Sequence, residues 1–580
     1  LLITAVAPPG FPRSIYLIDF LLSFLTLAGV RLLVRLLLEM ADQDGASAQA
    51  ARVLIYGAGA AGAMLLREIR TNAKLPYRVC GFVDDHPGKQ GIRIQGVQVW
   101  GTGAKLEALV RERAVQEILV AIPSATGDQM TQILERCHNA AVRCRTIPSL
   151  AELIREGRPL AQIRDVAVED LLGRSVVSLE PAQIRARLEN KAVLVTGAGG
   201  SIGSELCRQL TRFRPAAIVG FEVAENALFH LDREMRSHHP AVPFFACVGN
   251  IQNPRRLREV FDRYRPAVVY HAAAYKHVPM MESHIFEAVE NNVLGTAAVG
   301  RLAREYRVQD FVMISTDKAV HPTSVMGATK RVAELIVRAL HDSGTRFVSV
   351  RFGNVLGSNG SVIPLFKEQI ARGGPITVTH PNMRRYFMTI SEAAQLVIQA
   401  SSISRGGETF VLDMGVPVKI ADLARKLILL SGLRPEKDIR IEFVGVRPGE
   451  KLFEELSTQE ESTLPTGHEK IRVFRGDQPS RAALETHLDL LRRLCQAGDV
   501  DGLVLELKEI VPEYNPSSHL LKQVLSRETR ESLSAGYPAP EHDGACQPNV
   551  SQCPVHGAAF PAVSEPGACL VSTRILMNSG

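Results

Sequence analysis

Two glycine-rich turns, each set between an apolar strand and a helical pattern, constrain the fold of this chain more than any other feature. The first turn runs from Gly57 to Gly62 after residues 53–56, and the second runs from Gly197 to Gly203 after residues 192–196. Glycine permits a tight turn and a close approach of the backbone to a ligand. The helix that follows presents free N–H groups and the positive end of its dipole, so each turn predicts a site for a diphosphate.

The second turn is followed by the pattern of a dinucleotide-binding sheet. An apolar strand at 216–221 ends at Glu222, 19 residues after Gly203. A carboxylate there accepts hydrogen bonds from an adenosine ribose and repels a 2′-phosphate, so NAD is favoured over NADP. Further apolar strands at 267–270 and 311–314 alternate with helical patterns, as a doubly wound parallel sheet requires. The cofactor-binding residues predicted at this turn are Gly197, Gly200, Ser201, Ile202, Gly203 and Glu222.

The first turn predicts a second Rossmann-like sheet with less supporting pattern. A strand at 78–83 ends at Asp84-Asp85, a turn-rich loop follows from Gly88 to Gly91, and an apolar strand occupies 117–122. Such folds also serve as regulatory or assembly domains. Whether this domain binds a ligand is left open.

The composition restricts the partners of the chain. It is 46% hydrophobic and 22% charged, which is ordinary for a folded multi-domain protein. The net charge of +6, from 67 Lys+Arg and 61 Asp+Glu, is too balanced to indicate a nucleic-acid partner. Nine scattered cysteines are typical of a reducing compartment rather than of a disulfide framework.

The two ends of the chain differ from its middle. The sequence opens on Leu1 rather than Met, which suggests a missing start, and a largely apolar run at 15–30 continues to Leu33. We expect a membrane-spanning helix here, with Arg31 and Arg35 on the cytoplasmic side, and a buried amphipathic helix is the alternative. From Ser532 the chain is rich in Pro, Gly, Ala and Ser and is predicted to be disordered. No metal site is expected, because the Cys and His residues of the tail lack a second pair at ligand spacing.

A set of reactive side chains follows the strand at 311–314. Thr316, Asp317 and Lys318 place a hydroxyl, a carboxylate and an amine at the carboxyl end of this strand, and Lys330 follows in the next helical run. Ligands of open α/β sheets bind at that edge, so these residues are predicted to be catalytic. In the alternative interpretation, Asp317 and Lys318 form a solvated ion pair and Thr316 caps a helix.

Seven segments, in order, resemble the extended short-chain dehydrogenase/reductases that act on nucleotide sugars. They are VLVTGAGGSIGSELCRQL, HAAAYKHVPMME, NNVLGT, ISTDKAVHPTSVMGATK, RFGNVLGSNGSVIPLF, RRYFMTISEA and RPGEKLFEEL. The chain looks most like the membrane-anchored UDP-N-acetylglucosamine 4,6-dehydratases of bacterial capsule and O-antigen synthesis. The resemblance is close over residues 185–475, and the earlier segment GFVDDHPGKQGIRIQGVQVWG is similar to the additional N-terminal domain of that group.

The resemblance and the patterns together predict an α/β fold with two successive Rossmann-like, doubly wound parallel-sheet domains. Residues 1–45 are expected to be the end of a membrane anchor and a linker, and residues 46–150 an N-terminal Rossmann-like domain. A connecting segment at 151–184 leads to the catalytic domain with its substrate-binding part at 185–515. Residues 516–580 are expected to be a largely disordered tail. The resemblance also implies a homo-oligomer at the bacterial inner membrane, with its catalytic domain in the cytoplasm.

The resemblance implies a dehydration in which NAD is a bound catalyst. In this family a hydride leaves C4 of the sugar, water is lost across C5 and C6, and the hydride returns to C6. Met326 stands where short-chain dehydrogenases usually carry a catalytic tyrosine. The membrane-type subgroup that this chain resembles has the same substitution. Asp317 is therefore predicted to take the C4 hydroxyl proton and to protonate the departing C6 oxygen. Lys318, with a lowered pKa, is predicted to be the base at C5.

The remaining site residues rest on the resemblance alone. Thr316 would bond the C4 oxygen and Lys330 the nicotinamide ribose. Further cofactor contacts would come from Asn250, Ile251, His271, Ala272 and Ala273. The UDP-sugar would be held by Lys276, His277, Asn354, Ser358, Val362, Pro364, Arg385, Arg447 and Glu450.

Two other functions fit part of the sequence. A nucleotide-sugar 4-epimerase on the same fold would need the tyrosine base, so Met326 together with Asp317 and Lys318 argues against it. A membrane-tethered NAD-binding protein without turnover would explain the missing tyrosine. It would not explain why Thr316, Asp317, Lys318 and Lys330 occur together.

Overall fold

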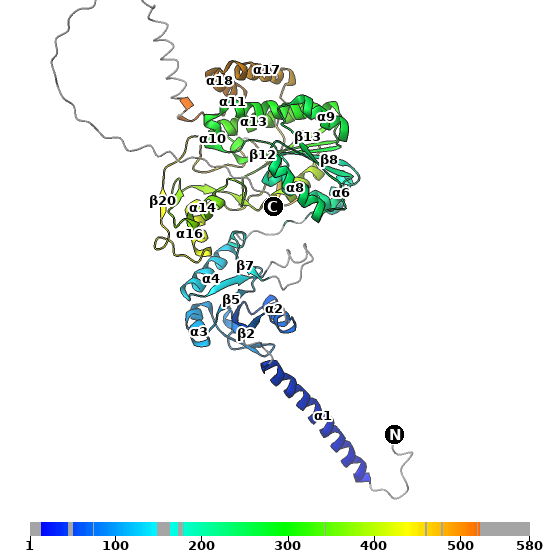
Figure 1. Cartoon of the computed structure of the whole chain (residues 1–580), viewed down its shortest axis with the longest axis vertical. Helices are drawn as coiled ribbons and strands as arrows, with labels where there is room; N and C mark the ends of the chain where they lie inside the picture. Colours follow the sequence, from blue (N-terminus) through cyan, green and yellow to red (C-terminus); the bar gives the residue numbers. More distant parts are fainter. Residues whose placement is uncertain are drawn as a thin grey trace, which may run out of the picture. The chain divides into compact units, whose positions relative to one another are not determined.

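The structure is a computed structural model of the 580-residue chain (Figure 1). It describes residues 13–44, 50–72, 75–147, 163–171, 177, 179–342, 344–458, 461–476, 479–518 and 520–521. Most of the predicted tail at 516–580, with the Cys and His residues considered above, lies outside the described residues. The described part contains no group of three or more His, Cys, Asp or Glu side chains suited to a metal ion.

Helix α1 (Arg13–Asp44) opens the described chain. Its side chains are described from Ile18 to Val34, and the large apolar ones are exposed, including Phe20 and Leu27. Among the described residues, no helix is both long enough and apolar enough to cross a membrane. The prediction of a transmembrane remnant at 1–45 is therefore not supported.

The N-terminal domain is built on a seven-stranded sheet with the strand order β3-β4-β2-β1-β5-β6-β7. The pairs from β4 to β6 are parallel, and the outer pairs β3–β4 and β6–β7 are antiparallel. Its strands are β1 (Ala51–Tyr56), β2 (Tyr77–Val83), β3 (Arg93–Ile94), β4 (Val97–Gly101), β5 (Glu117–Val120), β6 (Arg143–Thr146) and β7 (Arg164–Asp165). Its helices are α2 (Ala60–Thr71), α3 (Leu106–Arg113) and α4 (Gly127–Asn139).

The first glycine turn joins β1 to α2 in this domain. Gly57 has a φ of +115°, and a Cβ on Gly62 would lie 2.0 Å from the carbonyl oxygen of Gly57. Asp84, at the end of β2, accepts a hydrogen bond from the Ala58 amide (2.7 Å). Trp100, the single tryptophan of the sequence, lies on β4 against Gly81, with the Arg113 guanidinium 4.6 Å from its ring centroid.

The predicted catalytic domain is built on a nine-stranded sheet with the order β10-β9-β8-β11-β12-β13-β18-β22-β21. The seven strands from β10 to β18 are parallel, and β22 and β21 add an antiparallel edge. The strands of this sheet are β8 (Ala192–Thr196), β9 (Ala217–Glu222), β10 (Phe244–Val248), β11 (Val268–His271), β12 (Asp310–Thr316), β13 (Arg346–Phe352), β18 (Thr409–Leu412), β21 (Leu464–Pro465) and β22 (Ile471–Phe474). Successive strands are added on one side of β8 up to β10 and on its other side from β11 onward, and ligands of such sheets bind beyond that switch point.

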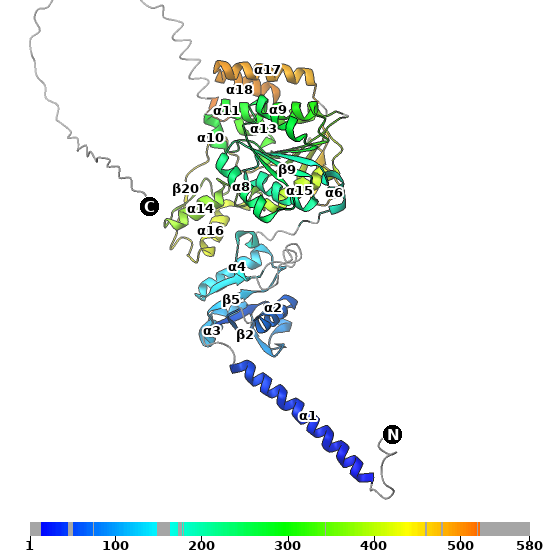
Figure 2. The ribbon, with the colours of Figure 1, turned by 45° about the vertical axis from the view of Figure 1, so that its right-hand side comes forward.

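Helices cover both faces of this sheet, as Figures 1 and 2 show. One face is packed by α9 (Pro254–Tyr264), α10 (Val278–Ser283), α11 (Ile285–Val289), α12 (Thr296–Glu305) and α13 (Val325–Leu340). The other face is packed by α6 (Pro181–Leu188), α7 (Ser201–Leu210), α8 (Glu225–His238) and α15 (Ile390–Ile403). Two apolar cores, one on each face, thus hold the sheet in place and confirm the predicted parallel α/β architecture.

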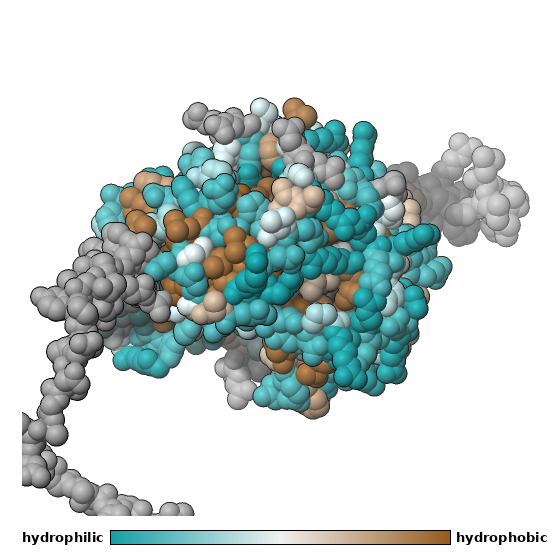
Figure 3. Space-filling view, turned by 90° about the horizontal axis from the view of Figure 1, so that it is seen from above, coloured by the Kyte–Doolittle hydropathy of each residue, from teal (hydrophilic) through white to brown (hydrophobic). Residues whose placement is uncertain are grey.

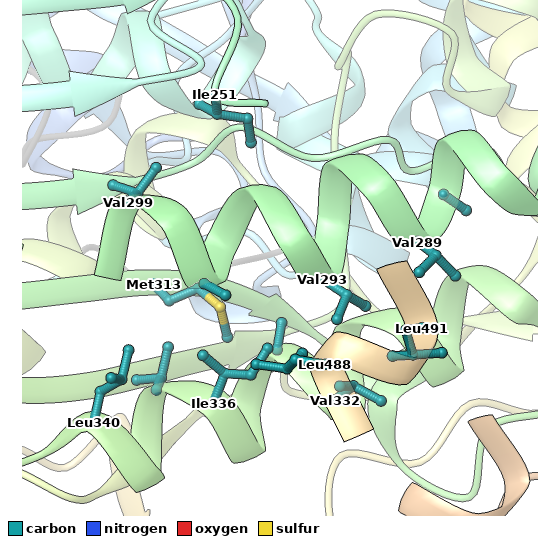
Figure 4. Close-up of a cluster of buried hydrophobic side chains, with 14 of the residues drawn as sticks. Ile251, Val289, Val293, Val299, Met313, Val332, Ile336, Leu340, Leu488 and Leu491 are labelled. Carbon is teal, nitrogen blue, oxygen red and sulfur yellow. The ribbon is translucent and has the colours of Figure 1, made fainter. Parts of the chain in front are cut away.

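Two C-terminal helices, α17 (Arg481–Ala497) and α18 (Val500–Ile510), extend the first of these cores. In the close-up of Figure 4, Leu488 of α17 lies beside Ile336 of α13, and Leu491 lies beside Val332. The apolar side of α17 is therefore used in packing onto α13.

The face of the molecule shown in Figure 3 is mostly hydrophilic, with smaller hydrophobic areas among the polar ones.

A smaller substrate-side part has a core of its own. It contains helices α14 (Val362–Ala371) and α16 (Ile420–Leu430) together with short strands. These strands are β14 (Asn354–Val355), β15 (Ile376–Val378), β16 (Arg384–Arg385), β17 (Phe387–Met388), β19 (Val418–Lys419) and β20 (Ile441–Phe443), the last of which pairs with β15. This part lies at the carboxyl ends of the main strands, because β14 follows almost directly after β13.

Candidate active site

A cavity of about 710 Å³ opens at the carboxyl ends of β8, β11 and β12. The second glycine turn forms one side of it, and the substrate-side part contributes residues such as Ser358 and Arg447. Thr316 and Lys318 line the same cavity. The topology therefore brings the predicted cofactor turn, the predicted catalytic residues and the predicted sugar-binding loops to one place.

The glycine turn is shaped so that only small residues fit. Gly197 has a φ of +68°, and a Cβ on it would lie 2.6 Å from the amide nitrogen of Ala273. A Cβ on Gly203 would lie 2.0 Å from the carbonyl oxygen of Gly197. Helix α7 begins at Ser201, so its free N–H groups face the cavity side of the turn. A diphosphate fits this combination of close backbone approach and helix N-terminus.

Glu222 lies at the end of β9 beside the glycine turn, as predicted. Its carboxylate accepts hydrogen bonds from the amides of Gly199 (2.9 Å) and Val223 (2.9 Å). The side chain is not part of the cavity lining, but these bonds hold it next to the turn that a dinucleotide would occupy. The residues present therefore fit a dinucleotide with an unphosphorylated ribose.

The other predicted cofactor residues are divided by the structure. Ala272 lines the cavity, and Ala273 lies against Gly197. Ile251 is buried, and its side chain packs against Gly295. Asn250 caps its own loop, because its side-chain oxygen accepts a hydrogen bond from the Gln252 amide (2.9 Å).

The side chain of His271 does not contact the cavity, contrary to the prediction that it binds cofactor. It is 1% exposed, and its two ring nitrogens bond the hydroxyls of Thr196 (2.7 Å) and Thr296 (2.9 Å). Burial lowers the pKa of His271 to about 3, so the ring is neutral at ordinary pH. His271 therefore joins β11 to β8 and α12 and serves the fold.

The predicted catalytic residues form one hydrogen-bonded group at the end of β12. The Thr316 hydroxyl donates to Asp317 Oδ1 (2.9 Å), and Lys318 Nζ donates to the same oxygen (2.9 Å). Lys318 Nζ also donates to Asn354 Oδ1 (3.2 Å). The Asp317 side chain is fully buried, and its Oδ2 has no hydrogen-bond partner among the described residues. Thr316 and Lys318 line the cavity, whereas Asp317 lies directly behind them.

The predicted lowering of the Lys318 pKa is wrong for the ligand-free site. Burial disfavours its charged form, but the carboxylates of Asp317 and Glu454 outweigh burial and raise the pKa above its ordinary value. The sequence-based expectation is that nearby Lys330 and the positive nicotinamide lower this pKa, and it does not include Glu454. The resting amine is therefore an ammonium held between two carboxylates.

Of the two predicted catalytic lysines, Lys318 and Lys330, it is Lys330 whose pKa is lowered. It is 4% exposed on α13, and burial brings its pKa to about 8. Met326, one turn earlier on the same helix, is buried and lines the cavity with Lys330. The position of the usual tyrosine thus faces the site, and a thioether occupies it.

Most of the predicted sugar-binding residues reach the cavity, and Pro364 is the exception, since it lies exposed on α14. Arg385 lines the cavity, but its guanidinium donates to the carbonyls of Lys451 (2.8 Å) and Leu452 (3.3 Å). It therefore fixes this loop, and its predicted contact with the UDP-sugar stays a prediction. The predicted residues that line the cavity are Lys276, His277, Asn354, Ser358, Val362, Arg385, Arg447 and Glu450.

Glu454 is a site residue that sequence reasoning missed. Its side chain is 2% exposed, it lines the cavity, and its Oε1 lies 3.4 Å from Lys318 Nζ. It belongs to the segment RPGEKLFEEL, in which Glu450 was predicted, and the two adjacent acids Glu454 and Glu455 were the available signal. Only the fold shows which of the two faces Lys318.

Comparison with known proteins gives the family. The model described as "Polysaccharide biosynthesis protein" matches residues 193–475. The capsular polysaccharide biosynthesis protein CapD of Staphylococcus aureus is 44% identical over 481 residues, which cover 82% of this chain and 79% of that protein. This chain belongs to that family. The result confirms the resemblance to the capsule-type extended short-chain dehydrogenase/reductases.

Other similarities cover the two domains separately. The model described as "CoA-binding domain" matches residues 5–148. A UDP-glucose 4-epimerase of Rickettsia rickettsii (strain Sheila Smith) is 34% identical over 282 residues, covering 47% of this chain and 79% of that protein. The structure of a UDP-glucose 4-epimerase of Thermus thermophilus in complex with NAD is 22% identical, with a TM-score of 0.40. That match covers 46% of this chain and 91% of the epimerase.

Proposed function

We propose that this member of the family dehydrates a UDP-N-acetylhexosamine, most simply UDP-N-acetylglucosamine, to the 4-keto-6-deoxy sugar nucleotide. The observation that carries the proposal is the hydrogen-bonded group of Thr316, Asp317 and Lys318 beside a methionine at the tyrosine position. A dehydratase needs an acid and a base for C5 and C6, and this group supplies both kinds of side chain. Family membership supports a role in surface polysaccharide synthesis.

The glycine turn is the proposed NAD site. Gly197, Gly200 and Gly203 would admit the diphosphate, and Glu222 would accept from the adenosine ribose. Lys330, buried in the cavity wall, would hold the nicotinamide ribose. Bound NAD supplies a hydride acceptor and donor, which makes the C5 proton acidic through a transient 4-ketone.

Thr316 and Asp317 would handle the proton of the C4 hydroxyl. Asp317 is buried behind Thr316, so the hydroxyl of Thr316 is the polar group that joins the cavity to the carboxylate. In this scheme the C4 proton passes through Thr316 to Asp317, and Asp317 later returns a proton to the departing C6 oxygen. The carboxylate ends the cycle in the state in which it began.

Lys318 would remove the C5 proton and return it to C5 after the hydride reaches C6. The resting ammonium must first lose its proton to water in the cavity, which its 20% exposed side chain reaches, because Asp317 is needed for the C4 proton. Asn354, which also contacts Nζ, holds the amine toward the cavity. The amine and the carboxylate thus divide the work that a tyrosine does in related enzymes.

The direct test is incubation of the purified protein with UDP-N-acetylglucosamine and NAD in deuterated water. We expect NMR to show a 4-keto-6-deoxy product with deuterium at C5, and no net formation of NADH. A product that keeps its C6 hydroxyl would contradict the proposal.

The second candidate is a nucleotide-sugar 4-epimerase, which the named Rickettsia relative favours. It would give UDP-N-acetylgalactosamine without loss of water in the same incubation, so one spectrum separates the two activities. A protein that binds NAD without turnover would give neither product. The location at the bacterial inner membrane and the homo-oligomer stay predictions.

A further inference from the structure

Glu454 is a buried carboxylate in the cavity wall to which no role is assigned by the reaction above. It lies in the loop between β20 and β21, and its side chain is 2% exposed. Its Oε2 has no hydrogen-bond partner among the described residues. Burial of a charged carboxylate is unfavourable unless the carboxylate is paired, so the groups around Glu454 indicate its role.

Four groups from different elements surround the Lys318 amine. Asp317 from η7 (Asp317–Ala319) and Asn354 from β14 accept its hydrogen bonds. Glu454 Oε1 lies 3.4 Å from Nζ, and the same oxygen lies 3.7 Å from Nε of Arg385 on β16. Glu454 therefore stands between two cations, and Arg385 partly opposes its effect on the lysine.

We propose that Glu454 is a positioning residue that controls the protonation of Lys318 and so sets the pH at which this lysine becomes a base. The proposal rests on the proposed function for its meaning in catalysis, but the contact itself does not depend on it. A carboxylate this close to a partly buried ammonium stabilises the charged form. The neutral amine therefore becomes available at a higher pH than it would without Glu454.

The first test measures Lys318 directly in the ligand-free protein. Trace acetylation with acetic anhydride over a pH series, followed by mass spectrometry, gives the pH midpoint at which Lys318 becomes reactive. We expect Glu454→Gln to lower this midpoint by about 1 pH unit or more. Glu455→Gln is the matched control, because Glu455 is exposed and pairs with His321, and it should leave the midpoint unchanged.

A second variant guards against misfolding of the first. Glu454→Asp keeps the charge but shortens the side chain, so it should lower the midpoint by less than Glu454→Gln does. An unchanged Lys318 midpoint in folded Glu454→Gln or an equal shift in Glu455→Gln would overturn the proposal.

The second test follows turnover. Where Lys318 acts as a base, the rising limb of kcat against pH should move to lower pH in Glu454→Gln by the same interval as the labelling midpoint. A loss of kcat that is equal at every pH would indicate a purely structural role and overturn the proposal. If the wild-type protein forms no dehydrated product, the proposed function fails, while the labelling experiment still decides the role of Glu454.

Discussion

At the scale of single residues, the proton path through Thr316 to Asp317 is the part of the proposed chemistry that substitutions test most directly. We expect Asp317→Asn to lower kcat by about 100-fold or more, because an amide can neither take nor return the proton. Thr316→Val should lower kcat similarly, whereas Thr316→Ser, which keeps the hydroxyl, should retain most of it. Product formation with UDP-N-acetylglucosamine measures all three. Turnover by Thr316→Val at the rate of Thr316→Ser would exclude the relay.

Lys330 gives a prediction on stability rather than on activity. Its pKa is about 8 in the folded protein, below the 10.5 of an unburied lysine. Between these values the unfolded chain binds a proton that the folded chain does not, so stability rises with pH from about 8 to 10.5. Below pH 8 the cost of burying the charged lysine is fully present, on the order of 3 kcal/mol.

The comparison of wild type with Lys330→Met isolates this effect. The variant should be more stable to urea at about pH 7, and the difference should shrink as the pH approaches about 10. Other titrating groups cancel in the difference. A difference that is constant with pH would show that Lys330 stays charged when buried.

The residues of the site were predictable to different degrees. Thr316, Asp317, Lys318 and Lys330 follow from a strand end and a motif, and the structure places them around one cavity. The burial of Asp317, the charge on Lys318 and the contact with Glu454 depend on which side chains meet in space. These contacts join residues that are far apart in the sequence, so local sequence patterns do not predict them.

At the scale of elements, the turn between β8 and α7 makes a steric prediction. Gly203→Ala should abolish NAD binding and destabilise the protein by about 1–3 kcal/mol, because its Cβ would meet a backbone oxygen that cannot move away. Gly467→Ala is the control, since no atom lies within 4 Å of a Cβ there. Calorimetric titration with NAD and thermal unfolding measure the two effects. Normal NAD binding by Gly203→Ala would remove this turn from the cofactor site.

A buried ionic network joins β13 to α13, the helix that carries Lys330. The Arg351 side chain is fully buried and bonds Glu334 (2.8 Å) and Glu461 (2.7 Å), and Ser315 donates to the same Glu334 (2.6 Å). Arg351→Met should cost about 3–5 kcal/mol, because it removes the fully buried cation between two buried carboxylates and leaves them paired only with Arg331.

Arg372→Met is the matched control for this network. Arg372 pairs with Glu368 on the surface of α14, and such exposed pairs contribute about 0–1 kcal/mol. Urea unfolding of both variants measures the contrast. Equal losses would mean that the buried network contributes no more than a surface pair does.

The elements of both sheets were largely predictable, because buried parallel strands read as short apolar runs. The predicted strands at 216–221 and 267–270 correspond to β9 and β11 with one-residue shifts, and 311–314 lies within β12. The antiparallel edge of β22 and β21 and the packing of α17 onto α13 were not predicted. No sequence motif indicates the edge strands or the packing of α17, since each depends on a surface that exists only after the central sheet has formed.

At the scale of the whole molecule, two sheets with separate cores predict two unfolding transitions. Saturating NAD, at about 100 times its dissociation constant, should stabilise the catalytic domain by about 2.7 kcal/mol and raise its transition. Differential scanning calorimetry with and without NAD measures this shift, and Gly203→Ala should show none. If NAD moved both transitions equally, either the two domains would unfold as one unit or the first glycine turn would also bind NAD.

The position of Trp100 has a practical consequence for such work. This lone indole is on β4 of the N-terminal domain, beneath the Arg113 guanidinium, so intrinsic emission excited near its absorption band arises from that domain only. The catalytic domain is optically silent in the same channel. The fluorescence of Trp100 therefore reports the unfolding of the N-terminal domain, while product formation reports the state of the other domain.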